Sequence, residues 1–187
     1  MTSTLSPTPV LAPGTWTIDA SHSEVSFSVR HLMVSKVRGT FRSFSGTFTT
    51  AQDPALASVE ASIDVASVDT RDERRDGHLR SADFFDVENH PVMTYRSSGV
   101  RAKGDGYVVD GELTLRGVTR PVELRLEHNG VSGDPWGGTR SGFSATAEIN
   151  RRDFGIDISM PLEGGGVVVG DKVTVQLEVE AVLQQAA

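Results

Sequence analysis

Histidine is the residue type with the widest chemical range in this chain of 187 residues, which contains His22, His31, His78, His90 and His128. An imidazole can act as acid, base or metal ligand near neutral pH. None of the five stands in an H-E-x-x-H or His-x-His pattern, so local spacing sets up no pair of metal ligands. His22 and His31 are nine residues apart in one strand region, which places them on opposite sides. A metal site would need ligands gathered from separate strands, and we predict none.

Patterns for nucleophilic catalysis and phosphate binding are missing as well. The chain has no cysteine and no G-x-S-x-G nucleophile elbow. The members of a Ser-His-Asp triad come together only in the folded structure, and no pattern in this sequence indicates one. The glycine-rich segment 164–170 lacks the Lys-Ser/Thr pair and the strand-to-helix setting of a phosphate loop. We interpret it as a flexible hairpin connection.

Segment 71–86 holds the densest group of charged and polar side chains. Its members are Asp72, Arg74, Arg75, Asp76, His78, Arg80 and Asp83. Paired carboxylates in such a group are compatible with acid–base chemistry. A solvated helix face joined by salt bridges is the commoner explanation. A third interpretation is that some of these residues gate or orient the head group of a ligand.

The composition excludes several classes of protein. The net charge is −7, with 18 Lys+Arg against 25 Asp+Glu and no long basic run. A protein that binds the nucleic-acid backbone needs a basic surface to displace counterions, so we expect no nucleic-acid partner, and an anionic membrane surface is disfavoured for the same reason. No stretch approaches the roughly 20 apolar residues of a spanning helix, so we predict that the chain is not a membrane protein.

The length suits one domain with short ends. Residues 1–13 contain three prolines with Ser and Thr, lack the basic and apolar regions of a signal peptide, and are predicted to form a flexible N-terminal arm. The domain is expected over 14–183, followed by a C-terminal tail at 184–187. The absence of a signal peptide and of cysteine favours a cytoplasmic location.

Alternation of apolar and polar residues dominates the chain from Trp16 onward. It is clear in segments 25–30, 59–65, 122–127 and 173–180. Such a pattern is typical of antiparallel strands with one face buried and one face in water. Additional strands are expected at 16–20, 37–48, 92–97, 108–115 and 142–149, which makes about nine in total.

Two irregularities are predicted within this pattern. Phe41 and Phe44 break the alternation by one residue, which indicates a β-bulge near Arg42–Ser43. A short turn or helix is expected to begin at Asn150 and to hold Phe154. Strands with one apolar face must close or stack to bury it, and periodicity alone leaves barrel and sandwich open.

One segment has helical character. Thr70 and Glu73 fit a capping box, which predicts a short helix from Arg71 to about Ser81. Asp76 and Arg80 are four residues apart and are expected to pair. With Phe84 and Phe85, this helix is predicted to cap one end of the sheet structure.

Alternation also assigns the residues that face inward. They are Trp16, Ile18, Val25, Phe27, Val29, Phe41, Ala61, Ile63, Met93, Tyr95, Val109, Leu113, Leu115, Leu124, Phe143 and Ala145. Phe84, Phe85 and Phe154 are the candidates for closing the ends. His31, His78 and Tyr95 are predicted at the mouth, where each has a donor for a quinone or phosphate oxygen.

Several blocks of this sequence are similar to the YceI-like proteins, which are described as lipocalin-like polyisoprenoid-binding proteins. The blocks are Trp16-Thr17-Ile18-Asp19 with His22-Ser23, Phe27-Ser28-Val29-Arg30-His31-Leu32, Gly39-Thr40-Phe41 with Phe44-Ser45-Gly46, Arg75-Asp76-Gly77-His78-Leu79 with Asp83-Phe84-Phe85-Asp86 and Pro91, Gly111-Glu112-Leu113-Thr114-Leu115-Arg116-Gly117-Val118, and Asn150-Arg151-Arg152-Asp153-Phe154-Gly155. The resemblance runs from about Gly14 to Val182, most of the chain, in these separate blocks. Any one block is weak, whereas their order and spacing together are specific.

The resemblance implies an all-β fold, an antiparallel eight-stranded lipocalin-like barrel with a short helix near one end. The helix is expected after the fourth or fifth strand. An isoprenoid-type chain is expected to fill the interior, with no catalytic residues, no required cofactor other than the bound polyisoprenoid, and a homodimeric assembly. Many relatives carry a secretory signal and work in the periplasm, and this chain departs from that pattern.

The function predicted from sequence is therefore the storage or transport of a polyisoprenoid, an isoprenoid quinone or a precursor inside the barrel, without catalysis. Two alternatives belong to other classes. One is an enzyme acting on an isoprenoid or another hydrophobic substrate. The other is an interaction module whose core is filled by its own side chains, because a filled core and an open channel produce the same alternation.

Overall fold

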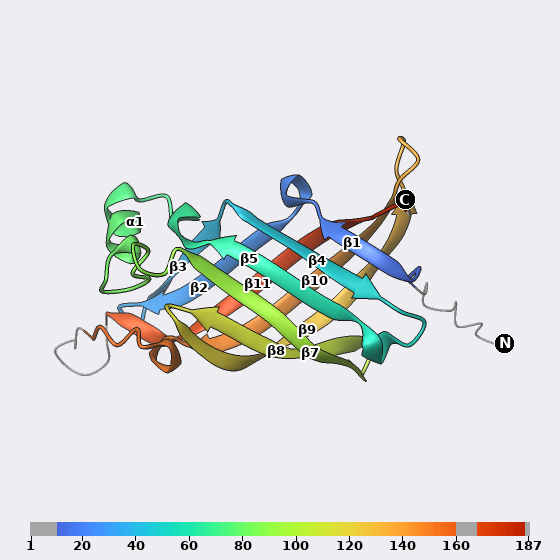
Figure 1. The fold of residues 1–187 in the computed structure, drawn as a ribbon. Coiled ribbons are helices and arrows are strands. Elements are labelled where there is room, and N and C mark those ends of the chain that lie inside the picture. Colours follow the sequence, from blue (N-terminus) through green and yellow to red (C-terminus); the bar gives the residue numbers. More distant parts are fainter. Residues whose placement is uncertain (1–10, 160–167, 186–187) are drawn as a thin grey trace.

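The computed structural model describes residues 11–159 and 168–185, and within them the chain is built mainly of β-strands (Figure 1). The strands are β1 (Gly14–Ile18), β2 (Glu24–His31), β3 (Ser35–Phe41), β4 (Phe44–Thr50), β5 (Ser58–Asp64), β6 (Val68–Asp69), β7 (Val92–Lys103), β8 (Gly106–Leu115), β9 (Val118–Gly133), β10 (Thr139–Asn150) and β11 (Val169–Leu183). The helical elements are α1 (Glu73–Arg80) and the 3₁₀ turns η1 (Ala20–His22), η2 (Pro54–Leu56), η3 (Val65–Ser67) and η4 (Arg151–Phe154).

The sheet closes on itself. Its order is β1-β4-β5-β7-β8-β9-β10-β11, and β1 also pairs with β11, so the described strands form an antiparallel ring of eight. Closure removes the unpaired edges that an open sheet would present. The structure therefore confirms the eight-stranded barrel and decides between the barrel and the sandwich.

The three remaining strands lengthen members of this ring. β2 continues β1 along β11, β3 lies beside β2, and β6 lies beside β3. Each extension is separated from its partner by a short break: η1 between β1 and β2, Arg42–Ser43 between β3 and β4, and η3 between β5 and β6. An irregularity is present at Arg42–Ser43, as predicted, but it is a break between β3 and β4 and not a β-bulge within one strand.

Neighbouring breaks satisfy one another's backbone groups. The amide of Arg42 donates to the carbonyl of Ser67 at 3.2 Å, and the amide of Ser43 donates to the Ser67 hydroxyl at 3.0 Å. An aspartate precedes each of the two 3₁₀ turns that form breaks, η1 and η3. Asp19 accepts a hydrogen bond from the amide of Ser21, and Asp64 accepts one from the amide of Ala66. The short side-chain carboxylate of Asp suits this position. The breaks therefore bend the wall of the barrel without leaving it open.

The helix begins later than the sequence predicts. Its N-cap is Asp72, whose carboxylate accepts from the amide of Arg75 at 3.0 Å. Arg71 has a φ of 63°, which lies outside the right-handed helical region, so a helix cannot start there. The hydroxyl of Thr70 donates instead to the buried carboxylate of Asp76. The predicted capping box of Thr70 and Glu73 is therefore wrong.

The predicted Asp76–Arg80 pair is also wrong. The Arg80 guanidinium donates to the carbonyls of Ala66 and Val68, at 3.0 and 3.4 Å. These bonds tie α1 to the strand before it. The helix lies across one end of the barrel, as predicted (Figure 1). Its place in the chain differs from the prediction. It follows β6, which extends β5, the third strand of the eight-stranded ring in chain order, whereas the helix was expected after the fourth or fifth strand.

The turn predicted after Asn150 is confirmed. Asn150 caps η4 by accepting from the amide of Arg152 at 3.0 Å, and Gly155 ends the turn with a φ of 72°. Phe154 is 1% exposed.

Among the described residues, no helix is long and apolar enough to cross a membrane. The predicted arm at 1–13 and the loop at 164–170 fall largely outside the described residues.

Candidate functional site

The barrel encloses a cavity of about 420 Å³ whose wall is almost entirely apolar. This volume is within the range of small-molecule sites, which is about 300–1,000 Å³. Most residues predicted from alternation to face inward line it, as do Phe84 and Phe85, two of the candidates for closing the ends. Those on the wall are Ile18, Val25, Phe27, Val29, Phe41, Ala61, Ile63, Phe84, Phe85, Met93, Tyr95, Val109, Leu113, Leu115, Leu124, Phe143 and Ala145.

Two other predicted residues lie in the core behind the wall. Trp16 is 0% exposed and stacks on Phe48, with 5.8 Å between ring centroids and 9° between planes. Its indole N–H donates to the hydroxyl of Thr50 at 3.1 Å. Phe154 ends η4 and belongs to the larger cluster of buried core residues. Both support the barrel without lining its cavity.

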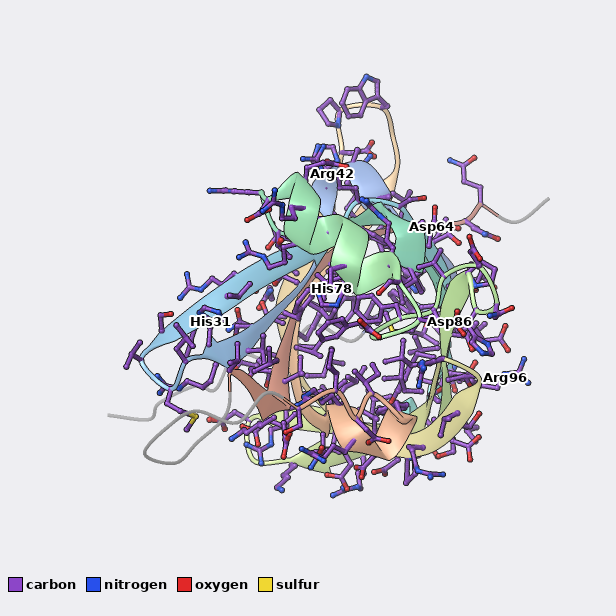
Figure 2. The ribbon with its side chains drawn as sticks, turned by 90° about the vertical axis from the view of Figure 1, so that its left-hand side faces the viewer. His31, Arg42, Asp64, His78, Asp86 and Arg96 are labelled. Carbon is purple, nitrogen blue, oxygen red and sulfur yellow. The ribbon has the colours of Figure 1, made fainter. Side chains whose placement is uncertain are left out.

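The three predicted mouth residues do not form one group. His78 lies on α1, where its Nε2 is 2.8 Å from the Asp83 carboxylate and its ring contacts Phe84 edge-on at 5.0 Å. His31 ends β2, on a separate hairpin, as Figure 2 shows when the barrel is viewed from the end that carries α1. Neither residue lines the cavity.

Tyr95 lies in the interior. Its hydroxyl donates to the carbonyl of Val122 at 3.0 Å, and burial raises the pKa of this phenol well above its usual value. Tyrosine when buried usually finds such a partner. The predicted role of Tyr95 as a donor at the mouth is therefore wrong, because its proton is already engaged within the wall.

Several residues on the wall were not predicted from the sequence. They include Phe44 and Phe48 on β4, Leu126 and His128 on β9, and Val173, Val175, Leu177 and Val179 on β11. The β11 residues are the apolar members of the alternation at 173–180, whose period of two places them on one face of the strand. On β9, continuing the period of two from Leu124 would have found Leu126 and His128.

A glycine shapes the wall near Phe27. Phe27 on β2 lies directly opposite Gly39 on β3, and its ring covers the glycine. A Cβ built on Gly39 would lie 2.4 Å from the ring, which is far inside van der Waals contact. The missing side chain therefore lets the Phe27 ring lie along the wall, leaving the centre of the barrel open.

We expect Gly39→Ala to push the Phe27 ring toward the cavity and to lower the free energy of unfolding by about 1–3 kcal/mol, the usual cost of overpacking. Binding of a long apolar chain is expected to weaken in the same variant. Gly99→Ala is the matched control, because nothing lies within 4 Å of a Cβ at Gly99. Chemical denaturation and lipid titration of both variants test this. Equal behaviour of the two would contradict the role given to Gly39.

His128 is the imidazole that lines the cavity. Its Nε2 is 2.8 Å from the hydroxyl of the buried Ser141, and its ring packs on Phe143 at 5.0 Å. Burial lowers the pKa of His128 below its usual value. The apolar wall therefore favours the neutral ring.

This lowered pKa gives a pH dependence. The unfolded state binds the proton more readily, so stability is greatest above a pH of about 6.5 and declines as the pH falls toward the folded pKa.

An apolar chain in the cavity removes more water from the His128 ring, so acid should also weaken binding of the chain. Affinity is expected to be constant above about pH 7 and to fall progressively below about pH 6.5, as the His128 ring of the lipid-free barrel becomes protonated. His128→Gln should abolish this dependence and His31→Gln should keep it, as titrations at each pH can show.

Arg151 is the arginine among the residues that line the cavity, and its donors are engaged. Its guanidinium donates to the carbonyls of Gly170, Ile156 and Val169 at 3.0, 2.7 and 3.3 Å, and lies 3.1 Å from the Asp171 carboxylate. These bonds hold η4 against β11. Arg151 therefore acts as a structural cation at this end of the barrel.

One group of residues has the composition of a metal site. Ligand atoms of Asp19, His22 and Glu180 lie within 4.8 Å of one another. The guanidinium of Arg140 already donates to Asp19 at 2.8 Å and to Glu180 at 2.6 Å. Hydrogen bonds from Ser21, Arg140 and His22 hold the pKa of the Asp19 carboxyl well below its usual range. An arginine thus supplies the positive charge that a metal would bring.

The polar cluster at 71–86 also has a structural explanation. Asp76, which is 4% exposed, accepts from the backbone and the hydroxyl of Thr70. Arg75 donates to the hydroxyl and the carbonyl of Thr70, at 2.7 and 2.8 Å. The network fastens α1 to the chain after β6. It leaves no pair of carboxylates aimed into the cavity among the described residues.

A closed antiparallel barrel of eight strands, with a short helix at one end and a hollow apolar interior, defines a lipocalin-like barrel. Comparison with known proteins specifies the family. Residues 16–181 match the YceI-like domain, and the chain belongs to the YceI-like family.

Individual relatives agree with this assignment. The chain is 44% identical over 139 residues to Protein YceI of Escherichia coli O17:K52:H18, an alignment that covers 74% of this chain and 73% of the relative. Its fold is similar to that of Burkholderia cenocepacia BcnA, with a TM-score of 0.73 and 25% identity over 87% of this chain and 98% of that one. A polyisoprenoid binding domain from Saccharophagus degradans has a TM-score of 0.68 at 19% identity, covering 90% of this chain and 98% of the domain, and shows the shared fold.

Proposed function

We propose that this protein binds a long-chain apolar lipid, of the polyisoprenoid or isoprenoid-quinone type, inside its barrel and holds it for storage or transport without changing it chemically. The observation that carries the proposal is the apolar cavity enclosed by the strands. The polyisoprenoid binding domain of Saccharophagus degradans, which shares the fold, supports the same class of ligand. The cavity favours a carrier over a module with a filled core.

The energetics favour a hydrocarbon chain. An isoprene unit has five carbons, and at about 0.8 kcal/mol for each buried CH₂ it contributes on the order of 4 kcal/mol. Ordering of the chain and loss of its translational freedom offset much of this sum. Aliphatic and aromatic side chains bind such a ligand without any charge, so a hydrophobic wall is sufficient for affinity.

The polar groups on the wall support binding over catalysis. Arg151 and the Tyr95 hydroxyl are engaged with backbone carbonyls, and His128 faces the Ser141 hydroxyl. General acid–base catalysis needs a group within hydrogen-bond reach of the reacting atoms and free to exchange a proton. His78, which an enzyme mechanism would have recruited, lies outside the wall.

Incubation of the delipidated protein with a long-chain polyprenol tests the proposal. We expect about one bound lipid per barrel, recovered with its mass unchanged after prolonged incubation. A product of different mass, formed by the wild type and not by His128→Gln, would indicate an enzyme. The homodimer and the cytoplasmic location stay predictions, to be tested by light scattering and by cell fractionation.

A further inference from the structure

The tip of the β2–β3 hairpin exposes three consecutive apolar side chains. Leu32, Met33 and Val34 are 40%, 54% and 80% exposed, between the paired residues His31 and Ser35. Apolar residues are common singly on protein surfaces, whereas a contiguous exposed group marks an interaction site. The tip therefore has the composition of a docking surface.

The backbone of this tip is strained by its own sequence. Leu32 and Met33 have φ values of 51° and 62°, and the amide of Val34 donates to the carbonyl of His31 at 3.2 Å. A tight turn with two positive φ angles favours Asn, Asp and Gly, because bulky side chains clash with the backbone there. Leu and Met occupy these positions without being buried. Strain that the fold does not need indicates a function at the site.

The charge around the tip is opposite to that of the whole chain. From Arg30 to Arg38 the hairpin contains two arginines, a lysine and a histidine and no carboxylate, although the net charge of the protein is −7. Arg30 lies directly opposite Lys36, a like-charge pair that destabilises a hairpin. Among the described residues, no carboxylate lies within 4.0 Å of the Arg30, Lys36 or Arg38 cations. The hairpin thus combines an apolar tip with a cationic base.

The tip adjoins the wall of the cavity. Val29 on β2 and Val169 on β11 line the cavity, and the amide of Leu32 donates to the carbonyl of Val168 at 2.8 Å. The hairpin lies at the end of the barrel that carries α1 (Figure 1). A surface docked by this tip is therefore brought to one end of the cavity.

We infer that the β2–β3 hairpin docks the barrel onto a lipid bilayer that contains anionic lipid. Apolar side chains enter the boundary between head groups and acyl chains, and nearby cations are attracted to the negative surface. The acidic net charge disfavours adsorption of the protein as a whole, so it orients the molecule with this one end toward the membrane. The inference rests on the proposed function in one respect, because a bilayer is the source of a lipid that does not dissolve in water.

Sedimentation with vesicles tests the inference on the full chain. The probes are phosphatidylcholine vesicles with and without phosphatidylglycerol. We expect the wild type to bind the anionic vesicles and to be released by high salt, which screens surface charge. Lys36→Glu removes one cation and adds one anion, and we expect an affinity loss of about 25-fold, since each unit of charge accounts for about fivefold, equivalent to about 1 kcal/mol.

A second variant separates docking from folding. Leu32→Asn combined with Met33→Gly places the residues that the turn prefers, so the unfolding temperature should stay equal or rise, while vesicle affinity falls about tenfold or more as apolar area is lost. Trp136→Ser is the matched control. Trp136 is 84% exposed on the β9–β10 hairpin at the opposite end of the barrel, so its removal should leave vesicle binding unchanged.

Three outcomes would overturn the inference. They are an absence of vesicle binding by the wild type, an equal loss of binding in Trp136→Ser, and a change of oligomeric state in the Leu32/Met33 variant, which would assign the tip to a second copy of the chain. Lipid content, measured by mass spectrometry on the same samples, reports separately on the proposed function. A barrel that retains lipid but ignores vesicles contradicts only the docking surface.

Discussion

Replacement of Leu177 by glutamate is expected to reduce the affinity for a long apolar chain by about a hundredfold or more while the barrel stays folded. Leu177 lies at the middle of β11, between Ala145 and Val25, and all three residues line the cavity. In the empty barrel, water in the cavity can hydrate the new carboxylate. A bound hydrocarbon would displace that water, and an unpaired charge without water costs several kcal/mol, of which about 2.7 kcal/mol already equals a hundredfold.

Gln176→Glu is the control for this variant. Gln176 is the neighbouring residue on the same strand and is exposed on the outer face. The two variants add the same charge one residue apart, on opposite sides of the wall. Fluorescent-lipid displacement should therefore detect a large loss for Leu177→Glu and none for Gln176→Glu. Retention of the lipid by both would mean that the chain does not occupy the interior.

The largest loss of stability is expected for Trp16→Ala, with a decrease of about 3–5 kcal/mol in the free energy of unfolding. Trp16 belongs to the second core cluster, with Phe48, Phe143 and Ala181, at the end of the barrel opposite α1. It is carried by β1, the strand that closes the ring by pairing with both β4 and β11. Loss of the indole leaves a large cavity at the place where β1 closes the ring of strands between β4 and β11.

Urea unfolding of Trp16→Ala and Trp136→Ala compares the buried and the exposed tryptophan. Trp136→Ala should change the free energy of unfolding by no more than about 0.5 kcal/mol, as surface substitutions usually do. A loss below about 1 kcal/mol for Trp16→Ala would show that closure of the barrel does not depend on this cluster.

The strands were predictable from sequence because their signal is local. In β2 and β5, and in segments 122–127 of β9 and 173–180 of β11, each apolar residue is followed by a polar one, so one period of two assigns both faces of the strand. The break at Arg42–Ser43 was visible for the same reason, as a shift in this period. Closure was not visible in this way, because β1 and β11 are paired across almost the whole length of the chain.

The cavity itself could not be derived from alternation. A side chain such as Trp16 that fills the core and one such as Leu177 that lines a space have the same inward direction. Their difference depends on the neighbours they meet across the barrel and on the rotamers they adopt. Gly39 illustrates this, since the room it provides for the Phe27 ring appears only when β2 and β3 are aligned.

Polar residues were the hardest to place. Thr70 and Glu73 fit a capping box, yet Asp72 is the cap, because several polar side chains compete for the same backbone amides. Tyr95 was predicted to be at a mouth from its hydroxyl, whereas that hydroxyl donates to a carbonyl inside the wall. His128 continues the inward face of β9 and was overlooked because its polarity interrupts the apolar pattern.

The central claim is that the interior of this barrel holds a long apolar chain. Mass spectrometry of an organic-solvent extract of the purified protein tests it most directly, with Leu177→Glu purified in parallel. We expect about one long-chain apolar lipid for each wild-type barrel and little or none in the variant. A wild-type extract without lipid, from a protein that also takes up none when polyprenol is supplied, would contradict the account.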